Sequence, residues 1–187
     1  IKEAAEKIKS SKNPIIISGG GVFYSDAMEE LSQFAIKHNI PVTQTVMGYS
    51  TMKRDHSHFA GQIGGLGGKN TNTLAKETDL AIAVGTKLAD FTTGSWANFE
   101  NENFKLVSIN VSRFDANKHL AQAVIGDAKV SLTELSQVLG SWKAGEEWNK
   151  KSQIELKSWN DHIDKESAPT NQEVPSYVQV IGAIYRN

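Results

Sequence analysis

Short apolar runs without polar alternation recur along the chain, and glycine follows each of them. Residues 15–17 are three isoleucines, followed shortly by the three glycines 19–21, and the run "LAIAV" at 80–84 is followed by Gly85. A β-branched run with no polar alternation is typical of a strand that is buried on both faces, as in a parallel sheet. These runs place the chain among the α/β proteins.

Helical patterns lie between the apolar runs, and this alternation predicts right-handed crossovers in a doubly wound sheet. Ser25 and Asp26 are suited to cap the first long helix, which Asn39 ends. We therefore expect an α/β fold with a Rossmann-like parallel sheet of about six strands, five of which the sequence pattern locates. The expected strands are 15–18, 40–48, 80–86, 105–112 and 123–129, the expected helices are 27–38, 74–79 and 130–142, and the expected loops are 49–73 and 91–103.

Glycines mark the carboxyl ends of the expected strands. Besides the glycines 19–21, Gly48, Gly85 and Gly126 each close one strand pattern. In open α/β sheets, ligands bind beyond the carboxyl ends of the strands, where the strand order reverses. The candidate site is therefore expected at this edge of the sheet.

The glycine run 19–21 departs from the dinucleotide fingerprint, because Tyr24 stands at the sixth position, where that motif needs glycine or alanine. Backbone N–H groups at a helix start could still hold a phosphate. A tight strand-to-helix turn explains the same glycines, and both interpretations stay open. The stretch "GGLGGKN" is not a Walker loop, because Ile63 and Asn70 replace the required glycine and Ser or Thr.

Charge and cysteine content narrow the range of partners. The formal net charge is -1, so neither nucleic acid nor an anionic membrane is an expected partner. The chain has no cysteine, which excludes disulfides and thiolate metal sites and fits a reducing cytoplasm. No apolar run approaches the roughly 18 residues of a membrane span.

The histidines do not form a metal-binding pattern. His56 and His58 are close in sequence, but a zinc site needs three or four ligands, so no metal site is expected. His38, His119 and His162 are isolated in sequence and are expected to be solvated.

Acidic residues near the expected strand ends do not suggest a hydrolytic triad. Asp79, Asp90 and Asp127 have neither a base nor a nucleophile nearby in the sequence pattern. These aspartates therefore give no basis for a triad of nucleophile, base and carboxylate.

The composition becomes polar and charged after about Gly140, which indicates an appendage to the first domain. We expect residues 1–143 to form that domain, residues 144–173 a helix and linker, and residues 174–187 the first helix of a truncated second domain. Both ends of the chain lie inside helical patterns, so the segment is expected to belong to a longer protein.

Several motifs together resemble the central domain of thiamine-diphosphate-dependent enzymes. They are "PIIISGGGV", "IPVTQTVMG", "DHSHFAGQIGGLGG", "DLAIAVGTKLADFTTGSW", "KLVSINVS" and "AVIGDAKVSLTEL", and they cover roughly residues 1–140 in order. The stretch "VGTKLADFTTGSW" looks most like the hydrolase branch of the family, which opens a cyclic trihydroxy dione in myo-inositol catabolism. The resemblance implies the Rossmann-like fold of these central domains, a DHS-like NAD/FAD-binding fold.

The resemblance implies that the catalytic machinery lies outside the segment. Family members use thiamine diphosphate (ThDP) and Mg²⁺, held by a pyrimidine-binding domain before the central domain and a pyrophosphate-binding domain after it. Those two domains, a small-molecule substrate and further copies of the chain in a homo-oligomer are the expected partners. The alternatives are the central domain of an acetolactate-synthase-like carboligase with FAD, and a stand-alone nucleotide- or flavin-binding module.

Flavin-containing relatives imply a nucleotide site on this domain, but three residues depart from their pattern. Lys87 and Phe91 stand where these relatives often carry arginine, and Asn110 stands near an acidic position. Lysine cannot reproduce the planar fork of arginine, so the departures count against FAD and favour a vestigial site or a purely structural domain. The positions carried over are Gly20, Gly21, Thr45, Gly64, Gly85, Thr86, Lys87, Asn110, Asp127 and Ala128.

Overall fold

The computed structural model describes residues 1–186 and contains one six-stranded parallel sheet in the order β3-β2-β1-β4-β5-β6. β1 and β4 pair along their whole length, from Pro14 opposite Leu80 to Ser18 opposite Val84. The strand order reverses between these two strands, as the alternation of strands and helices predicts. The strands are β1 (Pro14–Ser18), β2 (Val42–Gln44), β3 (Phe59–Gln62), β4 (Leu80–Val84), β5 (Lys105–Asn110) and β6 (Gln122–Ile125).

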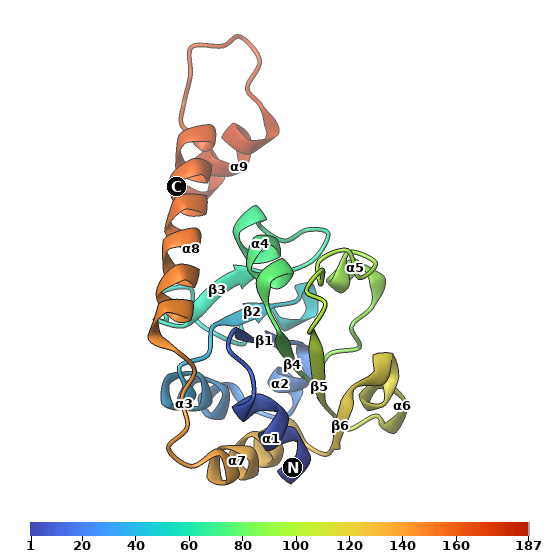
Figure 1. Cartoon of the computed structure of the whole chain (residues 1–187). Helices are drawn as coiled ribbons and strands as arrows, with labels where there is room; N and C mark the ends of the chain where they lie inside the picture. The colour runs from blue at the N-terminus through green and yellow to red at the C-terminus, as the bar shows by residue number, and fades with distance from the viewer. Residues whose placement is uncertain (187) are drawn as a thin grey trace.

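Helices cover both faces of the sheet (Figure 1). α1, α3 and α7 lie on one side, and α4, α5 and α8 lie on the other. The helices are α1 (Lys2–Lys9), α2 (Gly20–Tyr24), α3 (Met28–His38), α4 (Lys69–Glu77), α5 (Asp90–Thr93), α6 (Arg113–Ala116), α7 (Ala128–Leu139), α8 (Glu146–Ser167) and α9 (Tyr177–Arg186), with short 3-10 helices η1 (Val46–Gly48) and η2 (Lys118–Leu120).

The side chains of β1 explain why its sequence has no polar alternation. Ile16 points into the core beneath α1, α3 and α7, whereas Ile15 and Ile17 point into the opposite core beneath α4 and α8. All three are fully buried. Successive strand residues face opposite sides of a sheet, so a strand covered on both faces must be apolar at every position.

Several local expectations are wrong. The strand expected at 123–129 ends at Ile125, since α7 begins at Ala128, and the loop expected at 91–103 opens inside α5. β2 ends at Gln44, and the residues up to Gly48 form η1. The expected loop 49–73 contains β3, an edge strand that α8 covers. The N-cap of α3 is Ala27, without a side-chain cap, so Ser25 and Asp26 do not cap that helix.

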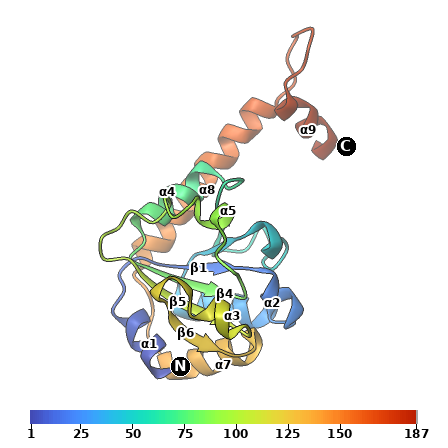
Figure 2. The ribbon, with the colours of Figure 1, turned by 90° about the vertical axis from the view of Figure 1, so that its right-hand side faces the viewer.

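The long helix α8 packs against the domain near its first residues and extends away from the domain near its last ones (Figure 2). Near its start, Trp148 is 5% exposed and its indole Nε1 donates a hydrogen bond of 2.8 Å to the carbonyl oxygen of Pro14. Further along, Gln153 donates to the carbonyl oxygen of Phe59 at 3.0 Å. No helix among residues 1–186 is long and apolar enough to cross a membrane.

Replacing Trp148 by phenylalanine is expected to lower the free energy of unfolding by about 1–2 kcal/mol. The substitution keeps most of the buried ring but removes the indole donor, which leaves a buried carbonyl without that partner. Urea unfolding followed by circular dichroism measures the change. The exposed Phe23 of α2 provides the control, because F23L should change the stability by less than about 0.5 kcal/mol. Equal stability of W148F and the parent chain would contradict the prediction.

Candidate functional site

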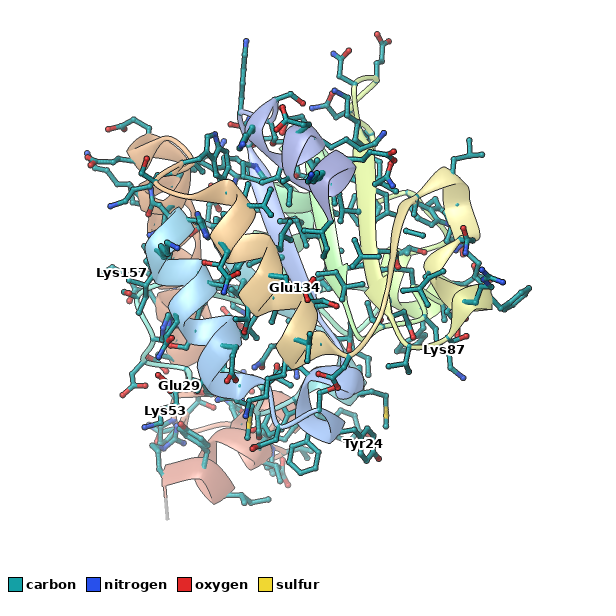
Figure 3. The ribbon with its side chains drawn as sticks, turned by 90° about the horizontal axis from the view of Figure 1, so that it is seen from below. Tyr24, Glu29, Lys53, Lys87, Glu134 and Lys157 are labelled. Carbon is teal, nitrogen blue, oxygen red and sulfur yellow. The ribbon has the colours of Figure 1, made fainter. Side chains whose placement is uncertain are left out.

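A hollow of about 320 Å³ lies at the carboxyl ends of β1, β4, β5 and β6, on one side of the point where the strand order reverses. It is lined by Gly21, Tyr24, Ser25, Gly85, Ile109, Asn110, Val111, Gly126 and Ala128. Four of the predicted site residues therefore lie together. In Figure 3, Tyr24 and Lys87 are both seen at the edge of the molecule where α2 and α6 lie.

The glycines after β1 and β4 allow these two loops to touch through their backbones. A Cβ on Gly21 would lie 2.6 Å from the Cα of Gly85, and a Cβ on Gly19 would lie 2.5 Å from the carbonyl oxygen of Gly85. The N–H of Gly21 donates to that same oxygen at 2.9 Å. Gly85 itself has a φ of +61°, in the left-handed region that favours glycine. Close packing of two loops is thus the first role of this glycine run.

Asn110, at the end of β5, ties the loop after β4 to the start of α6. Its Nδ2 donates to the carbonyl oxygen of Thr86 at 3.1 Å, and its Oδ1 accepts from the N–H of Ser112 at 2.9 Å. Both ends of the amide are therefore used within the protein. Asn110 shapes the wall of the hollow and positions the two loops.

Asp127 begins α7 beside the hollow and remains charged near neutral pH. Its Oδ1 accepts a hydrogen bond of 3.1 Å from the N–H of Val130, which makes it the N-cap of that helix. The neighbouring Ser25 hydroxyl, followed by this backbone N–H, lowers the pKa of the carboxyl below its ordinary value. Asp127 itself is not among the lining residues, although its chain neighbours Gly126 and Ala128 are.

The other predicted site residues do not line the hollow. Gly20 packs against η1, where a Cβ would lie 3.0 Å from the carbonyl oxygen of Met47. Thr45 caps η1 by accepting from the N–H of Gly48 at 3.0 Å. A Cβ on Gly64 would lie 2.4 Å from the carbonyl oxygen of Phe91. Thr86 is buried and Lys87 is exposed on the loop after β4, and neither is among the lining residues.

Tyr24, Ser25, Ile109 and Val111 line the hollow but were not predicted as site residues. Ile109 looks like an ordinary strand residue in the sequence. Tyr24, the last residue of α2, and Val111, which follows β5, are 83% and 71% exposed, and single exposed apolar residues have no periodicity that could identify them. Only their position directly after a strand or a glycine turn connects them with the carboxyl edge.

His56 and Ser32 form a close pair that cannot work as a base and nucleophile in this arrangement. The Nε2 of His56 lies 2.9 Å from the Ser32 hydroxyl, while its Nδ1 accepts the N–H of His58 at 3.1 Å. Nδ1 is therefore unprotonated, and the neutral ring carries its proton on Nε2, the atom facing serine. Within residues 1–186, no three His, Cys, Asp or Glu side chains are grouped to hold a metal ion.

The expectation that His38 is solvated is wrong. It is fully buried, with Nδ1 2.8 Å from the carbonyl oxygen of Trp142 and Nε2 3.0 Å from the Ser136 hydroxyl. Helical spacing places His38 on the face of α3 that packs against α7, a contact that sequence alone does not reveal. His119 and His162 are exposed, as expected.

Asp79 is a structural carboxylate at the amino end of β4, away from the hollow. It accepts hydrogen bonds from the Ser11 hydroxyl at 2.5 Å and from the N–H groups of Lys12 and Asn13 at 2.8 and 2.9 Å. Although burial opposes it, these hydrogen bonds lower the pKa of the carboxyl. Asp79 therefore fastens the turn before β1.

Comparison with known proteins supplies the context of this site. Residues 1–135 match the family model described as "Thiamine pyrophosphate enzyme, central domain". The chain is 47% identical over 135 residues to the 3D-(3,5/4)-trihydroxycyclohexane-1,2-dione hydrolase 2 of a Bacillus cereus strain, a match that covers 72% of the chain and 21% of the relative.

A relative from a second genus has the same description. The chain is 46% identical over 138 residues to the 3D-(3,5/4)-trihydroxycyclohexane-1,2-dione hydrolase of Clostridium perfringens (strain 13 / Type A), covering 74% of the chain and 22% of the relative. The chain thus spans about a fifth of the length of these curated relatives.

Proposed function

The chain belongs to the family of central domains of thiamine pyrophosphate enzymes, and from this premise we propose that it is the central domain of a ThDP- and Mg²⁺-dependent hydrolase. The proposed substrate is 3D-(3,5/4)-trihydroxycyclohexane-1,2-dione, whose C–C bond is cleaved to give 5-deoxy-glucuronate in cytoplasmic myo-inositol catabolism. The observation that carries this proposal is the 47% identity over 135 residues to a hydrolase of that name.

In this proposal the central domain has a structural role between the catalytic domains. The carboxyl-edge loops support it, because the N–H of Gly21 donates to the carbonyl oxygen of Gly85 and the amide of Asn110 is hydrogen-bonded to Thr86 and Ser112. Polar groups that are already paired within the protein are not free to act on a substrate. The segment alone is expected to be inactive.

The cofactor belongs to other parts of the proposed parent. Thiamine diphosphate, when bound, supplies the chemistry of C–C bond cleavage. Mg²⁺ bound with a diphosphate takes one or two carboxylates of the protein besides the phosphate oxygens. The domains that would hold both groups are proposed to flank this one.

We divide the chain accordingly into a central domain at 1–143, a helix and linker at 144–173, and the first helix of a pyrophosphate-binding domain at 174–187. Asn187 lies outside the described residues. Support comes from α9, on which Tyr177, Ile181, Ile184 and Tyr185 are each at least 66% exposed. An apolar helix of this kind is typical of a segment that packs against further chain.

The test is the substrate preference of the whole polypeptide, purified with ThDP and Mg²⁺. We expect it to consume trihydroxycyclohexanedione and to leave pyruvate unchanged, as followed by chromatography of the products. Turnover of pyruvate alone would overturn the proposal in favour of an acetolactate-synthase-like carboligase. A yellow, flavin-loaded protein that consumes neither compound would instead favour a nucleotide-binding module.

A further inference from the structure

The two edges of the sheet differ in how they are covered. At one edge α8 packs over β3, and the side chain of Gln153 donates to the carbonyl oxygen of Phe59 at 3.0 Å. At the other edge β6 is the last strand (Figure 1), and no strand among residues 1–186 pairs with its outer side. Unpaired backbone groups of an edge strand can pair with a strand of another chain. A further strand could therefore be added at β6.

The hydrogen bonds of β6 show which of its backbone groups face outward. The N–H of Gly126 donates to the carbonyl oxygen of Asn110 at 3.1 Å, so Gly126 faces β5. Because successive residues of a strand direct their N–H and C=O groups to opposite sides, Val124 also faces β5, whereas Ala123 and Ile125 face outward. Within residues 1–186, these outward groups have no hydrogen-bond partner in the protein.

The sequence of β6 contains nothing that would block pairing with another strand. Residues 120–126, "LAQAVIG", include no charge and no proline, with which natural edge strands avoid one another. Large apolar side chains are exposed beside the strand: Leu120 is fully exposed, Ile125 is 50% exposed, and Phe114 of the neighbouring α6 is 75% exposed. Exposed apolar groups that gather in this way are typical of a contact surface between proteins.

A second copy of this chain fits the edge, because the outward groups of β6 are complementary to themselves. When two β6 strands run antiparallel about a two-fold axis at Val124, Ala123 lies opposite Ile125 of the second copy, and the two exchange both N–H···O bonds. All outward N–H groups of both strands are then used. An axis at Ala123 would instead need the N–H of Ala121, which already donates to the carbonyl oxygen of Lys118 at 3.1 Å.

The residues on either side of β6 agree with this register. Leu120 would approach the start of α7 in the second copy, where Val130 is 56% exposed. Lys118, which contacts Asp115 at 2.7 Å, stands before the strand, and the acidic Asp127 stands after it. Antiparallel strands therefore bring opposite charges towards each other at both ends of the contact.

We propose that β6 is the contact surface for a second copy of this chain, and that the two copies form one continuous sheet with six strands from each. The homo-oligomer that the family resemblance implies thereby gains a defined surface on the central domain. This contact is a property of the domain itself and does not depend on which substrate the parent consumes.

Sedimentation equilibrium of the chain tests whether this surface is used. We expect the mass to approach twice that of the monomer as the concentration rises, and I125K to weaken the association by about tenfold or more, because a lysine would be placed at the paired edge. I184K, at an exposed isoleucine of α9, should associate like the parent chain. A monomeric parent chain, an I125K variant that associates as tightly as the parent, or equal losses in I125K and I184K would each overturn the proposal.

Single cysteines test the register, because the chain itself has none. Val124 would face Val124 of the second copy in a pair without hydrogen bonds, where Cα atoms about 4.5 Å apart can be joined by a disulfide. Under mild oxidation V124C should give a cross-linked dimer on a non-reducing gel. Q122C, two residues away on the same face of the strand, should stay largely uncross-linked. Cross-linking of V124C that is no stronger than that of Q122C would overturn the proposed pairing.

Discussion

Replacing Gly85 by alanine is expected to lower the free energy of unfolding by about 2–6 kcal/mol. The position has a φ of +61°, which costs a residue with a Cβ about 1–3 kcal/mol. The new Cβ would also lie 2.6 Å from the Cα of Gly21 and 2.9 Å from the backbone nitrogen of Val22. Backbone cannot move aside as a side chain can, so overpacking adds about 1–3 kcal/mol. Chemical unfolding monitored by circular dichroism measures the sum.

Gly94 is the matched control for Gly85. It ends α5 with a φ of +60° and a ψ of +41°, and a Cβ there would meet only the side chain of Asn98, at 3.1–3.3 Å. G94A therefore carries the backbone strain without overpacking against backbone and should cost about 1–3 kcal/mol. If G85A and G94A destabilise the chain equally, the contact between the loops after β1 and β4 contributes nothing, and the proposed packing role of the glycine run is wrong.

The same pair of loops shows what the sequence could predict. The apolar runs of β1 and β4 reveal buried parallel strands, and the glycines after them indicate the edge where these loops meet. Whether the glycines bind a phosphate or only pack is not encoded locally. That depends on Gly85, which lies 64 residues after Gly21 in the chain and whose carbonyl oxygen takes the N–H of Gly21.

β3, in contrast, is an element that the sequence could not predict. Its sequence, "FAGQ", contains one large apolar residue and a glycine with a φ of +108°, so it has little strand character. Phe59 and Ala60 are nevertheless buried, because α8 returns from the far end of the chain to cover this edge. When the burial of a strand depends on a helix that is distant in the sequence, the strand itself shows no periodic pattern of apolar residues that would predict it.

Lowering the pH from 7 to 5 is expected to remove about 2 kcal/mol of stability through His58 alone. This side chain is 7% exposed, and its ring lies 3.1 Å from Asn39 Oδ1 through Nε2 and 3.0 Å from the Ser57 hydroxyl through Nδ1. Because an amide oxygen only accepts, Nε2 carries a proton, while Nδ1 faces a hydroxyl from which it can accept. Burial first, and the adjacent His56 second, lower its pKa from 6.5 to about 4.

The sign follows from proton binding in the two states. Between pH 6.5 and 4 this histidine is protonated in the unfolded chain but not in the folded chain. The contribution of neutral His58 to the free energy of unfolding is therefore complete above pH 6.5 and declines as the pH falls. At about 1.4 kcal/mol for each pH unit, the full window corresponds to about 3 kcal/mol. Burial also lowers the pKa of His38, with the charges of Lys37 and Lys143 acting in the same direction and the Trp142 carbonyl opposing them.

We expect protonation of His58 to disturb the contacts at the start of α8. Asn39, the partner of His58, also donates through Nδ2 to the carbonyl oxygen of Ala144 at 3.2 Å, just before α8 begins. Tryptophan fluorescence reports on this region, because Trp142 and Trp148 lie on either side of Ala144. Acid should therefore alter the tryptophan signal of the folded chain before the sheet unfolds.

H58Q isolates the histidine from the carboxylates that also titrate at low pH. Glutamine can still donate to Asn39 but gains no proton, so the loss of stability between pH 7 and pH 5, measured by urea unfolding, should shrink by about 2 kcal/mol. H162Q, at an exposed position on α8, should retain the full pH dependence of the parent chain. If H58Q and the parent chain lose the same stability over this range, protonation of His58 is not what destabilises the fold in acid.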